Sequence, residues 1–291
     1  MNDFVLPTLW LALGATTLAA VVFWRAAVLS PSGTQQRNPS WLPFLRPFVS
    51  ASSDGAGLAR VAATVGALLM VVALLMRWQV TDRPPYTNMW EFSVAFSASI
   101  AVFYVALDRR LRAAPIVGGV IQGVVALLLL ATLLFFSSRV DPLVPALQSE
   151  GILMIHVGFM VASYGALSFS FGTAAVRLVQ GDARRFKALP TAAVLDRLSH
   201  ASVVVGFPLL TLGVLLGAYW ANDAWGRYWA WDPKETASLV TWLIYGAYLH
   251  IHSLGKWRGT RASVLLVAGY SSVMFTYFGV NLWISGLHSY A

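Results

Sequence analysis

The feature that most restricts the fold of this chain is a series of long apolar stretches without Asp, Glu, Lys or Arg. Residues 113–138 form one such stretch, and residues 151–176 form another. Each is longer than the about 20 residues that an α-helix needs to cross the roughly 30 Å hydrocarbon core of a membrane. Only 11% of all residues are charged, which is too few to cover the surface of a soluble domain. The sequence therefore predicts an all-α, polytopic transmembrane helical bundle.

The apolar stretches predict about eight membrane spans. Their expected limits are 4–28, 57–79, 90–108, 115–138, 151–178, 199–221, 233–253 and 262–286. No Lys or Arg precedes the first apolar run, so we interpret it as a retained helix and not as a signal peptide. Residues 1–56 are then the first transmembrane helix with a cytoplasmic linker, and residues 57–291 are the functional transmembrane core.

The distribution of basic residues predicts the orientation of the chain. If the N-terminus lies outside and the chain crosses the membrane eight times, most of the 20 basic residues fall on the cytoplasmic side. The outer side then holds only Arg77, Arg83, Arg139, Arg227 and Lys234. Cytoplasmic loops carry the excess of Lys and Arg, so both termini are expected to be extracytoplasmic in a multi-pass protein of the inner or plasma membrane. The net charge of +8 thereby reflects topology, and a nucleic-acid partner is not expected.

An aromatic segment lies in the expected outer loop between spans six and seven, within residues 220–235. Its rings are those of Trp220, Trp225, Tyr228, Trp229 and Trp231. Trp and Tyr collect at membrane interfaces, which accounts for one or two rings in a loop but not for four tryptophans. Clustered rings with apolar faces and polar edges favour a platform for a large, planar, conjugated ligand.

The end of this segment also has the pattern of a helix start. Asp232, Pro233 and Glu235 suit the N-cap, first and third positions of a helix. Asn88 and Glu91 have the same spacing before span three. The first expectation for both acidic residues is therefore a capping role, which also fixes the direction in which each loop enters its helix.

The five histidines divide by their expected depth in the membrane. His156 and His288 lie at the outer ends of spans five and eight, at the level of the aromatic segment. Two such imidazoles suit axial ligation of a haem iron. His250 lies near the cytoplasmic end of span seven, where a ligand role and an interfacial role are equally supported by depth alone. For His200 and His252 we favour the interfacial role.

At this point the residues match a known family. The segment Trp225-Gly226-x-x-Trp229-x-Trp231-Asp232-x-x-Glu235 resembles the WWD motif of the CcsA/ResC family, called CcsB in some bacteria, which belongs to system II of cytochrome c biogenesis. The resemblance extends through residues 83–91, 155–164, 241–250 and 278–290 in the expected order. It covers most of residues 77–291.

The resemblance implies a function in haem handling. Such a protein moves haem b outward as its substrate and, with a ResB-type membrane protein, presents it for thioether attachment to the CxxCH segment of apocytochrome c. The resemblance then implies that the chain is one subunit of a holocytochrome c synthase (haem lyase). A thioredoxin-like thiol reductant is compatible with this function as a further partner. By position in the motifs, His156 and His288 match the outer iron ligands and His250 matches the transmembrane ligand.

The resemblance also places the WWD segment against the haem. The haem-binding residues that it implies there are Trp225, Gly226, Arg227, Tyr228, Trp229, Trp231 and Asp232. The chain has no cysteine, so both thiols of the thioether bonds must come from the apocytochrome. Candidate cations for the haem carboxylates are the outer ones, Arg227, Lys234, Arg83 and Arg77, among which the sequence does not decide.

Two other functions compete with this interpretation. A permanent b-type haem subunit of an electron-transfer complex also uses paired histidines, and it remains the alternative. An ion-coupled transporter is disfavoured, because such proteins place acidic residues at the membrane midplane. The acidic residues of this chain fall in the expected loops or at the ends of spans.

Overall fold

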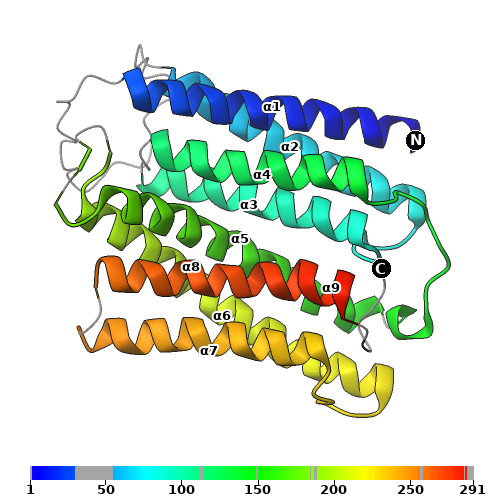
Figure 1. The fold of residues 1–291 in the computed structure, drawn as a ribbon. Coiled ribbons are helices and arrows are strands. Elements are labelled where there is room, and N and C mark those ends of the chain that lie inside the picture. The colour runs from blue at the N-terminus through cyan, green and yellow to red at the C-terminus, as the bar shows by residue number, and fades with distance from the viewer. Residues whose placement is uncertain are drawn as a thin grey trace.

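The protein is described by a computed structural model that covers residues 2–29, 55–111, 115–148, 150–183, 185–186, 189–255, 258–284 and 286. Within these residues it is helical, without strands (Figure 1). The elements are α1 Asn2–Leu29, α2 Ala56–Thr81, α3 Met89–Leu111, α4 Pro115–Phe135, the 3-10 turn η1 Pro145–Gln148, α5 Glu150–Gln180, α6 Ala192–Trp225, α7 Pro233–Ser253, α8 Thr260–Met274, the π-helical turn η2 Phe275–Gly279 and α9 Val280–Trp283. The predicted fold class is confirmed.

The predicted spans correspond to the long helices of the bundle. Seven segments of the described chain are long and apolar enough to cross a membrane, and α7 lies alongside them with 21 residues (Figure 1). Elements α8, η2 and α9 form one continuous rod over residues 260–283, so they supply a single span. Because α1 begins and α9 ends at the same end of the bundle, the chain makes an even number of crossings (Figure 1).

Helix α6 is longer than predicted at both ends. It begins at Ala192 because Asp196, in its first turns, is paired with the buried Arg177 of α5 at an Nε–Oδ1 distance of 3.1 Å. It continues to Trp225 and ends at Gly226, whose φ of 72° is the left-handed conformation that commonly terminates a helix. The connection to α7 is therefore only residues 226–232, and the first tryptophans of the aromatic segment are helical.

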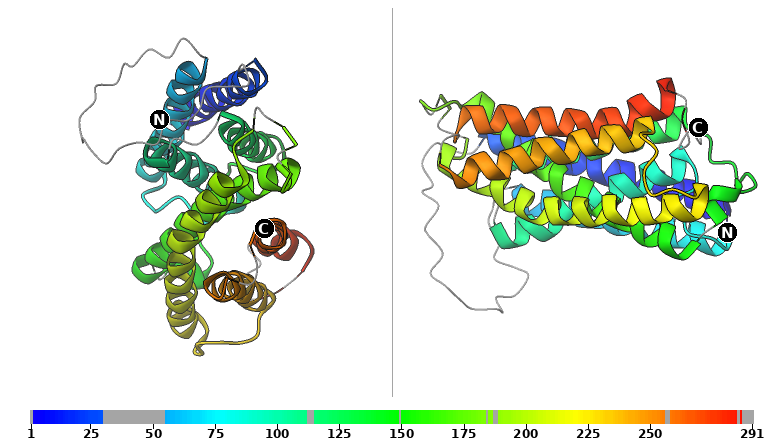
Figure 2. Two further views of the ribbon diagram at one scale, coloured as in Figure 1. Left: turned by 90° about the vertical axis from the view of Figure 1, so that its left-hand side faces the viewer. Right: turned by 90° about the horizontal axis from the view of Figure 1, so that it is seen from below.

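Helix α5 is the central element of the bundle. It packs against α3 and α4 on one side and against α6 and α8 on the other. Helices α1 and α2 cover α4 and α3, and α7 packs between α6 and α8, as the end-on view shows (Figure 2). The core follows the apolar faces of these helices, while the outward faces carry large exposed hydrophobic residues, as lipid contact requires.

Small residues allow the closest helix contacts. A Cβ at Gly66 of α2 would lie 2.7 Å from Cγ2 of Thr16 of α1, and one at Gly206 of α6 would lie 2.8 Å from Cδ2 of Leu167 of α5. Ser163 of α5 also donates a hydrogen bond to the carbonyl of Gly206 at 2.9 Å. Without a hydrophobic driving force between helices in lipid, such close backbone packing and hydrogen bonding hold the bundle together.

Candidate functional site

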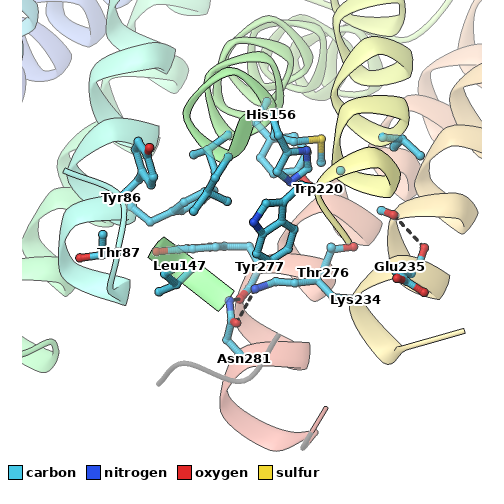
Figure 3. Close-up of a pocket in the computed structure, with 18 of the residues that line it drawn as sticks. Tyr86, Thr87, Leu147, His156, Trp220, Lys234, Glu235, Thr276, Tyr277 and Asn281 are labelled. Atoms are coloured by element: carbon cyan, nitrogen blue, oxygen red, sulfur yellow. Dashed lines mark hydrogen bonds between the residues drawn. The ribbon is translucent and has the colours of Figure 1, made fainter. Parts of the chain in front are cut away.

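A cavity of about 160 Å³ opens at the end of the bundle where α3, α5 and α7 begin (Figure 3). Most of its wall is apolar or aromatic. The lining residues are Tyr86, Thr87, Asn88, Met89, Phe92, Leu147, Leu153, His156, Val157, Met160, Tyr164, Val214, Gly217, Ala218, Trp220, Trp229, Lys234, Glu235, Ser238, Thr276, Tyr277 and Asn281. Five regions of the sequence, around residues 86–92, 147–164, 214–220, 229–238 and 276–281, therefore meet around one space.

His156 lies in the second turn of α5 and faces this cavity. Its Nδ1 lies 2.7 Å from the carbonyl oxygen of Gly213 on α6. A carbonyl only accepts, so Nδ1 carries the hydrogen in this contact and Nε2 carries the lone pair. A backbone carbonyl that fixes the tautomer and the ring orientation in this way is the usual partner of a metal-binding imidazole.

Two features of α6 fix the position of the His156 ring. Gly217 leaves the space that the ring fills, because a Cβ there would lie 2.5 Å from Cε1 and 2.8 Å from Nδ1. One turn further along, the buried Trp220 holds its ring parallel to the imidazole, with the centroids 6.2 Å apart and the planes at 6°. Trp220 donates from Nε1 to the carbonyl of Ala146 at 3.2 Å, so its orientation is fixed as well.

The aromatic segment divides into two sets instead of forming one platform. Trp220 and Trp229 line the cavity, and Trp225 packs edge-on against Trp220 at 4.8 Å between centroids. Trp231 and Tyr228 are exposed, at 69% and 57% of their surfaces. The chain leaves α6 at Gly226, and beyond this turn Trp229 lines the cavity whereas Trp231, which has a φ of 57°, is exposed. Gly226 and Arg227 are also exposed and do not line the cavity.

The expected helix start at α7 is confirmed in detail. Asp232 is buried and accepts from the backbone N–H of Lys234 at 2.8 Å and of Glu235 at 3.4 Å. Oε2 of Glu235 accepts in return from the N–H of Asp232 at 3.2 Å and of Ala230 at 2.8 Å. This capping box therefore fixes the backbone of residues 230–232 and, with it, the tryptophans on either side.

The opposite wall of the cavity begins in the same way. Asn88 caps α3 by accepting from the N–H of Glu91 at 2.9 Å, and Oε2 of Glu91 accepts from the N–H and the hydroxyl of Thr87. Oε1 of Glu91 pairs with Nε of Arg77 at 2.9 Å, and both side chains are buried. Arg77 also donates to the carbonyl of Ser138 at 2.9 Å. This network holds residues 86–89 against the cavity.

Lys234 brings the cationic group of the cavity. Its side chain reaches from the first turn of α7 to Asn281 of α9, with Nζ 2.7 Å from Oδ1 (Figure 3). Of the other outer cations, Arg77 is engaged with Glu91, and Arg83 donates to the carbonyl of Asp141 at 2.9 Å. Neither of these two, nor Arg227, lines the cavity.

The inner histidines lie at the other end of the bundle. His250 lies 17 residues after the start of α7, about 26 Å along the axis at 1.5 Å per residue. Its side chain is exposed. His252 faces the opposite way and stacks on His200 of α6, with centroids 3.9 Å apart and planes at 15°. Tyr248 lies against both rings.

The remaining predicted ligand, His288, lies outside the described residues. The described chain reaches Gly286, where a Cβ would lie 2.6 Å from Oδ2 of Asp232. Within the described residues, no three His, Cys, Asp or Glu side chains form a group that could hold a bare metal ion. Of the predicted site residues, the cavity brings His156 and Trp229 together, and Asp232 caps the helix that carries Lys234 and Glu235 of its wall.

Four residues that line the cavity or fix its histidine were not among the haem-binding residues predicted from the sequence. Gly213 and Gly217 are spaced four residues apart, so they lie on one helix face, a pattern that could have indicated close contact with another helix. Trp220 was grouped with the loop, although its helical periodicity with Gly213 and Gly217 places it on the same face. Asn281 gave no signal beyond its position in a motif, because its role depends on contact with a residue 47 positions away.

Comparison with known proteins shows the family of the chain. Residues 86–288 match the model of a family described as cytochrome C assembly protein. The chain is 35% identical over 253 residues to the cytochrome c biogenesis protein CcsA of Mesostigma viride, which covers 76% of this chain and 82% of the relative. It is 35% identical over 272 residues to CcsA of Synechococcus sp. (strain CC9605), covering 82% and 88%. The chain is a multi-pass helical membrane protein of cytochrome c assembly, and it belongs to the cytochrome c assembly protein family.

The fold is also similar to that of a solved structure. The cytochrome c haem lyase CcmF superposes with a TM-score of 0.63 at 18% sequence identity. The match covers 93% of this chain and 45% of the CcmF chain, so this chain spans less than half the length of that protein. At this level of identity the likeness concerns the arrangement of helices alone.

Proposed function

We propose that this protein carries haem to the outer side of the membrane and presents it for thioether attachment to the CxxCH segment of apocytochrome c, together with a ResB-type membrane partner. The observation that carries the proposal is the setting of His156. Its imidazole is held in the tautomer that suits iron ligation, at the wall of an aromatic cavity. His288 is the second axial ligand in this proposal.

The chemistry needs positioning more than acid–base groups. Each thioether forms when a cysteine S–H adds across a vinyl group of the haem, so that sulfur bonds to one vinyl carbon and the hydrogen ends on the other. No oxidant or leaving group takes part. A rigid site that holds the porphyrin while the apocytochrome thiols arrive lowers the entropic barrier of this addition. The capping box at the start of α7 and the hydrogen bonds of Asn88 and Glu91 at the start of α3 give the cavity that rigidity.

The inner end supports an entry position for haem at His250. This imidazole is exposed on the outside of the bundle, so a side chain of the partner could approach the same iron from the other face. The pair His200 and His252 does not suit this role, because rings stacked at 3.9 Å leave no space for a porphyrin between them. With the cavity end outside and the His250 end facing the cytoplasm, the proposal agrees with the distribution of basic residues.

The test is co-expression of the chain with a ResB-type partner and a reporter apocytochrome, scored as covalent haem on the reporter. His156→Ala should abolish the covalent product, and added imidazole should restore part of it by filling the open axial position. His252→Ala is the matched control, because it removes an imidazole at the far end. Full activity of the His156→Ala complex would overturn the proposal, whereas a loss that imidazole does not restore would point to folding.

A further inference from the structure

The apolar cavity has one cationic corner. Lys234 and Asn281 both line the cavity, and Nζ of Lys234 donates to Oδ1 of Asn281 at 2.7 Å (Figure 3). Nδ2 of Asn281 donates to the carbonyl of Tyr277 at 2.6 Å, so the amide is fixed with its oxygen toward the lysine. An ammonium group has three hydrogens to donate, and this contact uses one of them.

Lys234 has no ion-pair partner among the described residues, whose four ion pairs do not include it. The two neighbouring carboxylates serve the backbone instead: Asp232 accepts from the N–H groups of residues 234 and 235, and Glu235 from those of residues 230 and 232. The Lys234 ammonium is largely buried and forms no ion pair with a described residue, and the nearby charge of Asp232 offsets only part of the cost of its burial, so a ligand that brings an anionic group would be stabilised at this corner.

The other outer cations do not compete for this role. Arg77 already pairs with Glu91, and Arg83 donates to a backbone carbonyl away from the cavity. Arg139 and Arg227 are exposed and do not contribute to the cavity wall. A carboxylate inside the cavity therefore meets one cationic side chain of the described chain, which is Lys234.

We infer that the Lys234–Asn281 corner binds a carboxylate group of the planar ligand in this cavity. This inference rests on the proposed function, in which the ligand is haem and the carboxylate is one of its two propionates. The carboxylates of haem lie along one edge of the ring. Holding that edge at α7 and α9 while the iron meets His156 fixes the rotation of the porphyrin in its plane, and turns the apolar opposite edge away from these two helices.

The test compares haem with its dimethyl ester, which keeps the iron, the vinyl groups and the ring but has no carboxylate. Binding of each to the purified full-length complex is followed by the iron absorption bands. The unmodified complex should bind haem about tenfold to a hundredfold more tightly than the ester, the range of a charge-assisted hydrogen bond. Equal affinity for the two ligands would overturn the inference without any variant.

Variants assign the preference to the residue. Lys234→Met should bind haem and the ester equally, whereas Lys234→Arg and the exposed control Arg139→Met should keep a preference for haem. A preference that persists in Lys234→Met would refute the role of this lysine. Failure of the proposed function gives a different pattern. In that case the iron spectrum of either bound ligand would be the same in His156→Ala as in the unmodified complex, or neither ligand would bind.

Discussion

The contact between Gly217 and His156 leads to a sharp prediction. In Gly217→Ala, the new methyl group would lie 2.5 Å from Cε1 and 2.8 Å from Nδ1 of the imidazole, so the ring must move. Moving it lengthens the 2.7 Å contact with the carbonyl of Gly213 that fixes the tautomer. Loss of this hydrogen bond costs about 1 kcal/mol, and overpacking a filled site costs about 1–3 kcal/mol.

These costs act first on the ligand, because the three atoms nearest to the new methyl group, at 2.5, 2.8 and 3.3 Å, all belong to the imidazole of His156. Loss of a group that orients a metal ligand typically lowers metal affinity about 10–100-fold. We therefore expect Gly217→Ala to weaken haem binding by about that factor and so to lower the haem content of the purified complex, with partial recovery on adding imidazole. The measurement is the pyridine haemochrome absorbance per mole of protein.

Gly158→Ala is the matched control. Gly158 lies on α5, half a turn from His156, and a Cβ there meets nothing within 4 Å. Both substitutions replace a helical glycine by alanine, so they share the same gain of about 1 kcal/mol in helix propensity. Normal haem content and an unchanged iron spectrum in Gly217→Ala would refute the argument that α6 sets the position of His156. An equal loss in both variants would show a general effect on the helix pair.

Three other predictions follow from the positions of the side chains. Trp229→Ala should lower haem occupancy more than Trp10→Ala, because Trp229 lines the cavity and Trp10 is an exposed ring on α1; equal losses would favour simple interfacial anchoring of both. His250→Ala should deplete haem from the complex more than His252→Ala, measured as haem per complex, and the reverse order would assign the inner ligand to His252. A periplasm-active reporter inserted between α6 and α7 should be active, and so should a cytoplasm-active reporter inserted between α3 and α4. If a reporter is silent at its site while the reporter for the other compartment is active at the same site, the predicted orientation is wrong.

The fold was largely predictable because membrane insertion leaves few alternatives. In a bilayer each backbone polar group must be satisfied within its own segment, so an uncharged stretch such as residues 113–138 has little choice except a helix. The helix starts at Asp232 and Asn88 were equally predictable, because capping is a local interaction over three residues. The limits of α6 were not, because its early start depends on a pair between Asp196 and a residue of another helix.

The cavity was predictable only in part, since its geometry depends on contacts between distant segments. The aromatic segment drew attention to Trp229, but composition does not show that the chain turns at Gly226 and leaves Trp231 exposed. The five histidines also looked more similar in sequence than they are in space. His200 and His252 stack on each other, while His250 faces outward from the same helix as His252, and only the packing of α6 on α7 separates these roles.

The cavity lies at the helix ends for a physical reason. Glu91 and Glu235 are buried, and in the interior of a bilayer such carboxylates are costly. At the first turn of a helix the backbone N–H groups lack intrahelical partners, so they solvate a carboxylate without further cost. Each glutamate then fixes the loop that precedes its helix, and the two loops form facing walls. A site that needs both an apolar interior for a porphyrin and polar groups to hold it rigid is therefore most easily built where α3 and α7 begin, with α5 bringing His156 between them.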